Sequence, residues 1–466
     1  MKRCLQLAVA TVAAISFLPD PAVGVEAGLD SLQEKTSFSG VSGVTFGQIM
    51  SGYRPGSITE SQGGIRQKFH KDILLGWDVW LTLELQLSQK VRGVFSGGGN
   101  ISYDLYANYQ GLDRLIERRK QSKRSFFGIT QTYLDFNLIK SGNTEFDLKV
   151  GYFPNRYSPH AKNLGEYLFR TEAYPNVIFT GGIDNCTPSV LGIKFSSKYH
   201  KFLSNDFILS SESETYPFFD VSLSDIVTLS VADLLSIGVG GSLWRVVPAD
   251  DDLTTPGKLE TTNYGYREQY RPLFDDTATI DPDTITYTRK ATKLVSTVSF
   301  DPKGLFPSEA FGEKDLILYA EAAVLGVKDY PQFYDDIVER TPIMVGFNVP
   351  TFKLLDVLAI ELEHHSWEYP NTIEGIYTHD SPIPLLFTRD MQNLQGVEET
   401  IEVGKVEDNF KWSIYFKRTI FDHFIVQGQA AKDHFRMADS EGRLVSEPNF
   451  GAFGEWYYML KAQYAF

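Results

Sequence analysis

Apolar and polar residues alternate over about ten positions in one segment after another of this 466-residue chain. In the clearest example the apolar positions are Val79, Leu81, Leu83, Leu85 and Leu87, and the intervening positions include Asp78, Thr82, Glu84 and Gln86. A period of two places each set on its own face of a β-strand. Each such segment therefore predicts a strand with one apolar face and one face that tolerates charge.

The alternation predicts about 16 strands, within a range of about 14 to 18, joined by connections that alternate between long and short. We place them near residues 37–52, 75–89, 100–110, 126–139, 144–153, 188–197, 205–212, 217–224, 234–246, 286–300, 314–328, 342–349, 354–366, 409–417, 423–436 and 455–466. Long connections cover 53–74, 111–125, 154–187, 247–285, 367–408 and 437–454, and short ones cover 140–143, 198–204, 350–353 and 418–422. Gly97, Gly98 and Gly99 are interpreted as a turn before the third strand. Many strands match the 9–11 residues that cross a bilayer at a tilt, so we expect an all-β, transmembrane, antiparallel up-and-down β-barrel.

The N-terminus has the pattern of a cleaved secretory signal. Lys2 and Arg3 precede an apolar stretch over residues 4–18, which is too short to span a bilayer, and small residues allow cleavage after Gly24 or Ala27. We expect a signal peptide over 1–27, a short periplasmic segment over 28–36 and the barrel over 37–466. An apolar N-terminal helix is the alternative.

The last strand places aromatic and apolar residues on one face and ends the chain on Phe466. In this respect the sequence resembles bacterial outer-membrane β-barrels of the porin type found in Gram-negative cells, although no motif identifies a subfamily. The resemblance implies export to the outer membrane, contact with its lipid and lipopolysaccharide, passage of a small solute, and recognition of the last strand by the barrel-assembly machinery. The residues expected to carry that assembly signal are Tyr458, Leu460, Ala462, Tyr464 and Phe466. A homotrimer and a monomer both remain open.

Composition agrees with a barrel and excludes other classes. Mean hydropathy is −0.19 and the chain has no repeated apolar runs of about 20 residues, which excludes a bundle of membrane-spanning helices. The formal net charge of −15 argues against nucleic acid as a partner. Aromatic residues make up 14% of the chain, as interfacial girdles require; the candidates near strand ends are Trp77, Trp367, Tyr369, Trp456 and Tyr458.

The connection over 154–187 is the third on the long-loop side. In general porins the corresponding loop folds inward and narrows the pore, so the resemblance implies a charged constriction here. Its candidate residues are Arg156, Glu166, Arg170, Glu172 and Asp184. Leu164 and Leu168 predict a short helix over 162–170. An exposed loop without a role in the pore is the alternative.

Alternation also predicts which charged residues line the lumen. The acidic ones are Asp78, Glu84, Asp104, Asp135, Asp147, Glu321, Glu361 and Glu363, and the basic ones are Lys149, Lys411 and Lys417. The excess of acidic residues predicts a mild cation preference. We therefore expect passive or selective diffusion of small hydrophilic solutes, with no catalysis, no cofactor and no metal ion.

Two other functions remain as alternatives. His364 and Ser366 share the outward face of one strand, as in some lipid-modifying hydrolases of the outer membrane, but no third residue completes the set that activates a serine. A secreted β-protein that binds polysaccharide through surface aromatics is the other alternative. Glu361, Glu363 and His365 also share a strand, about 7 Å apart, which is too wide for one metal ion.

Overall fold

The computed structural model describes residues 36–53, 68–69, 72–105, 124–169, 189–211, 219–232, 234–247, 292–305, 309–327, 337–364, 410–432, 437–438, 444–445 and 456–466. Within these ranges the chain forms β-strands and two 3-10 turns, η4 (Pro302–Leu305) and η5 (Ile337–Arg340). No helix among the described residues is long and apolar enough to cross a membrane. The signal peptide and the segment before residue 36 lie outside the described ranges.

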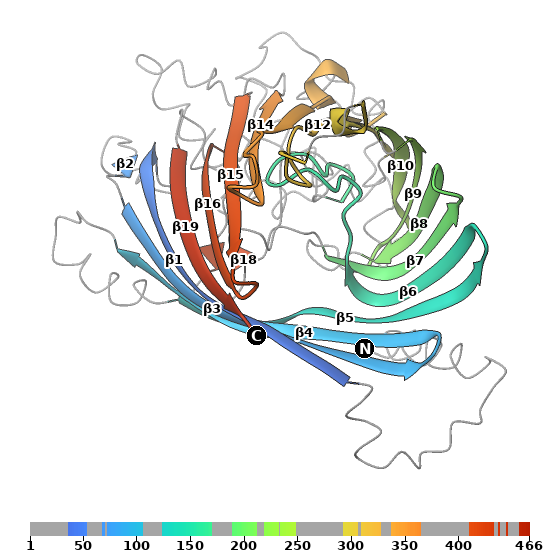
Figure 1. Ribbon diagram of the computed structural model, residues 1–466, viewed down its shortest axis with the longest axis horizontal. Helices are drawn as coiled ribbons and strands as arrows, with labels where there is room; N and C mark the ends of the chain where they lie inside the picture. The colour runs from blue at the N-terminus through green and yellow to red at the C-terminus, as the bar shows by residue number, and fades with distance from the viewer. Residues whose placement is uncertain are drawn as a thin grey trace, which may run out of the picture.

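The strands close into one barrel (Figure 1). Its long strands are β1 (Thr36–Tyr53), β3 (Asp72–Ser88), β4 (Val91–Leu105), β5 (Arg124–Ser141), β6 (Thr144–Pro154), β7 (Ser189–Tyr199), β8 (Leu203–Ser211), β9 (Val221–Val231), β10 (Leu235–Val247), β11 (Thr292–Phe300), β12 (Leu318–Val324), β13 (Ile343–Asn348), β14 (Val357–His364), β15 (Phe410–Ile420), β16 (Phe424–Lys432) and β19 (Trp456–Ala465). The two-residue strand β2 (Lys68–Phe69) joins the end of β1, and β17 (Met437–Ala438) pairs separately with β18 (Leu444–Val445).

Antiparallel pairing of β1 with both β3 and β19 closes the barrel. Val41 lies opposite Trp80 on β3 and opposite Ala465 on β19, so the first and last long strands are neighbours. Each remaining long strand pairs with the next one along the chain. The predicted 16-strand, up-and-down antiparallel barrel is therefore confirmed. Because the barrel is closed, it has no free strand edge whose backbone N–H and C=O groups would lack hydrogen-bond partners. A lipid environment requires this.

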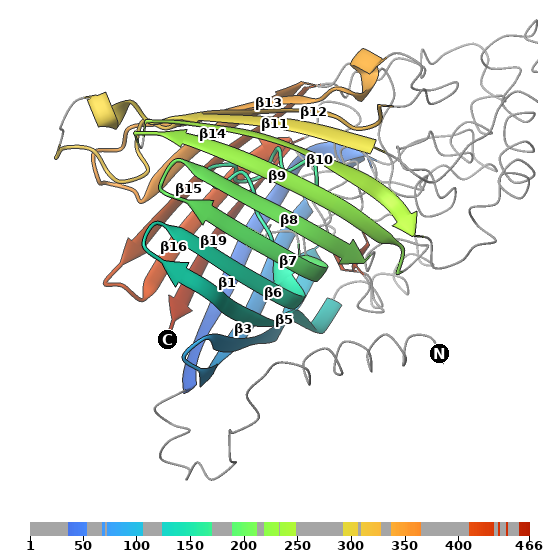
Figure 2. The same cartoon turned by 90° about the vertical axis from the view of Figure 1, so that its right-hand side faces the viewer.

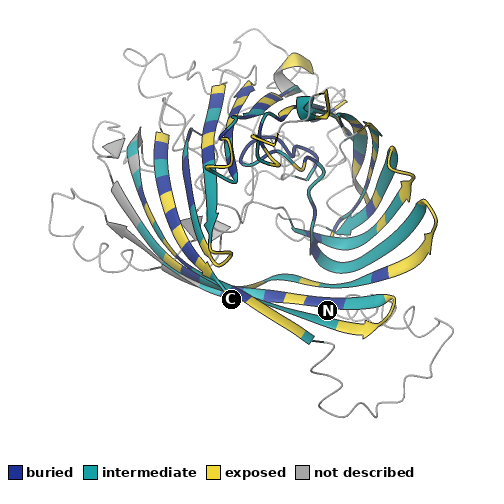
Figure 3. Ribbon diagram, in the orientation of Figure 1, coloured by how far each residue is buried: buried dark blue, intermediate teal, exposed yellow. Residues whose placement is uncertain are grey.

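Burial alternates along the strands, as the sequence pattern predicts (Figure 3). On β14, Glu361 and Glu363 are buried while Ile360, Leu362 and His364 are exposed. On β19 the exposed face carries Trp456, Leu460 and Tyr464, and the buried face carries Met459 and Lys461. The outside of the barrel is thus apolar and the inside carries the charged residues, the arrangement of a membrane-spanning barrel.

The glycine triplet is not a turn, contrary to the sequence-based interpretation. Gly97, Gly98 and Gly99 lie within β4, and the tight turn before that strand is at Gln89 and Lys90. A Cβ on Gly98 would lie 2.1 Å from the Val79 carbonyl oxygen and 2.8 Å from the Trp80 ring. Glycine is needed at this position because the two strands approach each other too closely for a side chain.

The other long strands match the expected ones with shifted ends. The expected strands over 100–110 and 217–224 are displaced most, because β4 runs from Val91 to Leu105 and β9 from Val221 to Val231. Most connections at one end of the barrel are short, as at Gln89 and Lys90 or Gly142 and Asn143, although the one between β11 and β12 covers 301–317; the opposite end has long ones over 106–123, 155–188, 248–291 and 365–409 (Figure 2).

Candidate pore constriction

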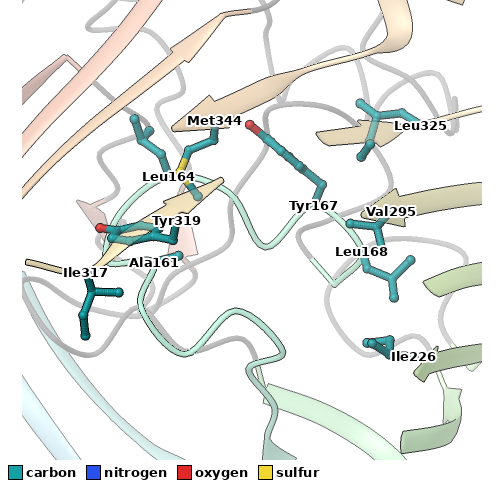
Figure 4. Packing of buried hydrophobic residues seen from close by; sticks show 11 residues of the cluster. Ala161, Leu164, Tyr167, Leu168, Ile226, Val295, Ile317, Tyr319, Leu325 and Met344 are labelled. Atoms are coloured by element: carbon teal, nitrogen blue, oxygen red, sulfur yellow. The ribbon is translucent and has the colours of Figure 1, made fainter. Parts of the chain in front are cut away.

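The described part of the third long connection, residues 155–169, lies inside the barrel against the wall formed by β11 to β14. Ala161, Leu164, Tyr167 and Leu168 pack into a buried cluster with wall residues (Figure 4). The wall side chains of this cluster are Ile226, Val295, Ile317, Tyr319, Ala323, Leu325 and Met344. Apolar contact therefore holds this segment, which we call the inner loop, to one side of the barrel.

Glu361 on β14 accepts hydrogen bonds from consecutive backbone N–H groups of the inner loop. Lys162 N donates to its Oε1 at 2.5 Å, and Asn163 N and Leu164 N donate to its Oε2 at 2.8 and 3.0 Å. The Tyr319 hydroxyl donates to Oε1 at 2.9 Å. Such charge-assisted bonds satisfy a buried carboxylate and fix the loop backbone at the same time.

Glu321 on β12 binds the next part of the loop in the same way. Glu166 N and Tyr167 N donate to it at 2.8 and 2.9 Å, and the Tyr157 hydroxyl donates to its Oε1. Burial, followed by the negative charges of Glu321 and Glu166, raises the pKa of the Tyr157 phenol well above its ordinary value of 10. The phenol therefore stays protonated and remains a donor.

Further contacts extend this attachment to neighbouring strands. The Tyr167 hydroxyl donates to Glu363 Oε2 at 2.7 Å, and Asn163 Nδ2 donates to Ser413 Oγ on β15 at 2.6 Å. The inner loop is thus attached to β12, β14 and β15.

The expected helix over 162–170 is wrong for the described residues, which form turns and bends. The physical reason lies in the donors just described: the N–H groups of residues 162–164, 166 and 167 bond to carboxylates on the wall. A helix beginning at residue 162 would need the N–H groups of Glu166 and Tyr167 for the carbonyl oxygens of residues 162 and 163, but Glu321 accepts from both. Leu164 and Leu168 still lie on the buried side, although their spacing does not reflect a helix.

Two of the five candidate constriction residues are described. Glu166 is buried and accepts hydrogen bonds from Tyr157 N at 3.3 Å and Ser158 N at 2.7 Å, so its carboxylate stabilises the loop itself. Arg156 donates through Nη1 to the Ala161 carbonyl oxygen at 2.7 Å. Arg170, Glu172 and Asp184 lie outside the described residues.

Several acidic residues expected on the lumen wall have partners within the protein. Glu321, Glu361 and Glu363 bond to the inner loop, and Asp78 Oδ1 lies 3.0 Å from the Lys461 ammonium. Lys461 belongs to the inward set of the last strand but was not singled out from the sequence. These four carboxylates carry no freely hydrated charge, because each is almost fully buried.

More accessible charges gather on the wall formed by β3 to β8. Arg92 on β4 pairs with Glu84 at 3.3 Å and with Asp135 at 2.9 Å, and the side chains of both Arg92 and Glu84 are 40% exposed. Lys194 on β7 pairs with Asp206 on β8 at 2.8 Å. The sequence analysis did not name Arg92, Lys194 and Asp206 as lumen-lining residues. Their positions in the alternating pattern of their strands place them on the inward face and could have identified them.

The other candidate residues of the wall are distributed around it. Lys149 lies over the Tyr133 ring at 5.5 Å, and Asp147 is half-buried two residues before it on β6. Lys411 is buried and Lys417 half-buried on the inward face of β15. The side chain of Asp104 lies outside the described residues.

The C-terminal strand presents its expected face to the outside. Leu460, Ala462, Tyr464 and Phe466 are exposed, and Tyr458 donates from its hydroxyl to Gln48 Oε1 at 3.1 Å. The last residue is bound through its backbone to β1, because Phe466 N donates to the Gly40 oxygen at 2.9 Å. Of the predicted girdle residues, Trp77 and Trp456 are exposed, while Trp367 and Tyr369 lie outside the described ranges.

The alternative sites gain no support from the described residues. His364 is exposed at the end of β14, but Ser366 and His365 lie outside the described ranges. No group of three or more His, Cys, Asp or Glu side chains among the described residues could hold a metal ion.

No protein-family model matches the chain, and no curated protein matches it. Among solved structures, the high-pH structure of Pseudomonas putida OprB is similar, with 10% identity and a TM-score of 0.45 over 93% of this chain and 95% of that chain. Salmonella typhi OmpF in complex with daunomycin has 8% identity and a TM-score of 0.42 over 92% and 97%. A mutant of the Rh. blastica porin has 7% identity and a TM-score of 0.37 over 92% and 100%. These values assign no residue role; the assignment of a closed barrel with an apolar outer face rests on the strand pairing and burial pattern of this chain.

Proposed function

We propose that this protein is an outer-membrane channel for small hydrophilic solutes, and that the inner loop narrows its lumen from one side. The observation that carries the proposal is the attachment of residues 155–169 to the inner wall by Glu321 and Glu361. A segment held inside a closed barrel reduces the cross-section available to a solute. Such a channel selects by size and by the field of its lining charges.

We further propose a mild cation preference, carried by the β3 to β8 wall. The carboxylates of its ion pairs, Glu84, Asp135 and Asp206, outnumber the two cations, Arg92 and Lys194, and their side chains are 40%, 19% and 32% exposed. This differs from a count of all inward acidic residues, because Asp78, Glu321, Glu361 and Glu363 are almost fully buried and do not face the lumen water. Passive diffusion requires neither a catalytic residue nor a cofactor.

Single-channel recording in a planar bilayer tests the proposal. Wild-type protein is expected to give discrete conductance steps, and E361Q is expected to give larger ones. In E361Q an amide NH2 replaces one carboxylate oxygen, either Oε1, which faces Lys162 N and the Tyr319 hydroxyl, or Oε2, which faces Asn163 N and Leu164 N. Whichever way the amide is oriented, two donors then face a donor, so residues 162–164 lose part of their attachment to β14.

The matched control is E145Q, because Glu145 forms an exposed pair with Lys140 beside the β5–β6 turn, away from the inner loop. Its conductance is expected to equal that of wild type. Every variant is first checked for heat-modifiable migration on a gel, so that only folded barrels are compared. Absence of wild-type conductance would overturn the channel, whereas equal conductance of E361Q and wild type would overturn the role of the inner loop.

A further inference from the structure

Two polar side chains lie on the lipid-facing side of the barrel, Asn205 on β8 and Asp225 on β9. Ile226 belongs to the buried cluster around the inner loop, and Asp206 pairs with Lys194 on the inner wall. Because successive side chains of a strand point to opposite faces, Asp225 and Asn205 point outward. Asn205 Nδ2 donates to Asp225 Oδ1 at 2.7 Å, and Asp225 is exposed. We call these two residues the outer polar pair.

Asp225 lies too deep in its strand to reach the water on either side of a membrane. It is in the middle part of β9, whose 11 residues match the length that crosses a bilayer at a tilt. The two ends of the strand, Val221 and Val231, are about 9 and 14 Å from Asp225 in height at a 45° tilt, and the apolar band of such barrels is about 25 Å tall. An aspartate side chain cannot extend to the headgroups as a lysine or an arginine does.

The surface around the pair is apolar and leaves the carboxylate uncovered. Phe207 lies directly opposite Asp225 on β8, Val227 shares the outward face of β9, and both are exposed. Gly241 lies opposite Asp225 on β10 and has no side chain to shield it. The strands β7 to β10 run side by side over this wall (Figure 2). By contrast, the outward face of β3 is apolar from Val79 to Leu87.

The pair has hydrogen-bonding capacity that the barrel itself does not use. Within the described part of the chain, the Asn205 amide is the only side chain that bonds to Asp225, and it does so at Oδ1. The other contact of Asn205 Nδ2, with the Ile226 carbonyl oxygen at 3.5 Å, is at the limit of a hydrogen bond. Acyl chains offer neither donors nor acceptors, so a carboxylate in this state is unfavourable among lipid. An ionisable group at this depth therefore indicates contact with another polypeptide.

We propose that β8 and β9 form a twofold dimer interface within the membrane, in which Asp225 of each copy accepts a hydrogen bond from Asn205 of the other. Two copies have the same orientation in the membrane, so a rotation about the membrane normal relates them. A twofold rotation brings the left side of one surface opposite the right side of the other. Each Asn205 then meets the second copy's Asp225 at the same depth.

The chemistry of the pair favours a second copy as the occupant of this surface. The pair contains one donor and one acceptor, so it is complementary to itself, as an isologous contact requires. Gly241 beside it allows two walls to approach closely. In a ring of three copies the contacts are heterologous, so the pair would face a different sector of its neighbour. The outward face of β3 from Val79 to Leu87, for example, offers no side-chain donor to Asp225.

Cross-linking of the full-length protein in phospholipid vesicles, at a low protein-to-lipid ratio, tests this proposal. V227C places a thiol beside the pair, because Val227 lies opposite Asn205, and it is made in a background carrying C4S and C186S. A short bifunctional thiol reagent is expected to convert most of this variant to a covalent dimer on a denaturing gel. The matched control is V44C, which replaces an exposed outward valine of β1 on the far side of the barrel and is expected to stay monomeric.

Changes to the pair distinguish an interface from a contact that serves only the barrel. D225L, added to V227C, removes the acceptor and makes the surface compatible with lipid. The dimer should then weaken about tenfold or more, the effect of losing two hydrogen bonds to charged groups, while the heat-modifiable migration of the barrel is retained. The exchange of N205D with D225N keeps one donor and one acceptor at the interface, so it should preserve cross-linking.

A monomeric V227C would overturn the proposal, and so would cross-linking of V44C as strong as that of V227C. Unchanged cross-linking of V227C after D225L would show that the pair does not hold the copies together. Cross-linking of V227C in native outer membranes to a different protein, in place of a second copy, would also overturn it. Only variants with heat-modifiable migration are compared. No step depends on conductance, so the result is independent of the proposed channel.

Discussion

The Lys461 ammonium lies 3.0 Å from the Asp78 carboxylate, although the two residues belong to strands separated by β1. Gly43 on β1 lies opposite Asp78 on one side and Gln463 on the other. A Cβ at Gly43 would lie 3.1 Å from Lys461 Cε and 2.6 Å from Gln463 Cγ, so glycine leaves the space in which the pair meets. The pair therefore connects the first and last parts of the barrel across its closing strand.

Removing one partner of this pair is expected to destabilise the barrel strongly. K461M leaves the Asp78 carboxylate buried without its cation, which costs about 3–5 kcal/mol. The measurement is the denaturant midpoint of unfolding in detergent or vesicles. D78N combined with K461M is expected to recover part of the loss, and a K461M midpoint equal to that of wild type would contradict the prediction.

The β3–β8 wall is expected to set charge selectivity. E84Q combined with D135N removes the two carboxylates that pair with Arg92, so the cation-to-anion permeability ratio should fall about twofold, the effect of about 0.4 kcal/mol. The reversal potential under a salt gradient measures this ratio. E145Q, which removes one carboxylate at the end of the same wall, should lower the ratio less; a larger ratio in the double variant would be the opposite of what we expect.

Acid pH is expected to weaken the attachment of the inner loop. Burial, followed by the positive charge of Lys162, lowers the pKa of His160 below its ordinary value of 6.5, although Asp301 opposes this. The attached loop thus favours neutral imidazole, whereas a released loop can take up a proton. The contribution of neutral His160 to the attachment of the inner loop is complete above about pH 6.5. It is lost as the pH falls toward the lower pKa that His160 has in the attached loop.

Conductance recorded as the pH falls below about 6.5 should therefore rise in wild type. His160 also lies near Lys303, Lys314 and the Tyr319 ring, so protonation adds a cation beside existing ones. H160Q should show a smaller rise over the same interval. An equal rise in both proteins would assign the pH response to other groups.

Gly98 is expected to tolerate no side chain. G98V would place carbon atoms against the Val79 carbonyl and the Trp80 ring, at a cost of about 1–3 kcal/mol or more. G93A is the matched control on the same strand, because its added Cβ would meet nothing closer than 3.6 Å. The temperature at which the folded band disappears from a gel should fall for G98V and remain unchanged for G93A.

Alternation along the chain was sufficient to predict the barrel, its strand number and the faces of β14, β15 and β19. It worked because a period of two records which side of a strand faces lipid, and every lipid-facing residue must be compatible with acyl chains. The interpretation of Gly97–Gly99 as a turn came from glycine as a turn signal and was wrong, because glycine also serves close strand packing and the relevant neighbour, Trp80, lies on another strand.

The candidate site could be predicted only in part. The sequence indicated the third long connection and the inward position of Glu321, Glu361 and Glu363, since both follow from the order and phase of the strands. The sequence did not show which of these charged side chains would pair with other groups of the protein. The pairing of Asp78 with Lys461, and of Glu361 with the backbone of residues 162–164, joins positions that are hundreds of residues apart. Local pattern thus determined which face each side chain occupies, and tertiary structure decided which carboxylates hold the inner loop and which remain accessible, because pairing depends on distances across the closed barrel.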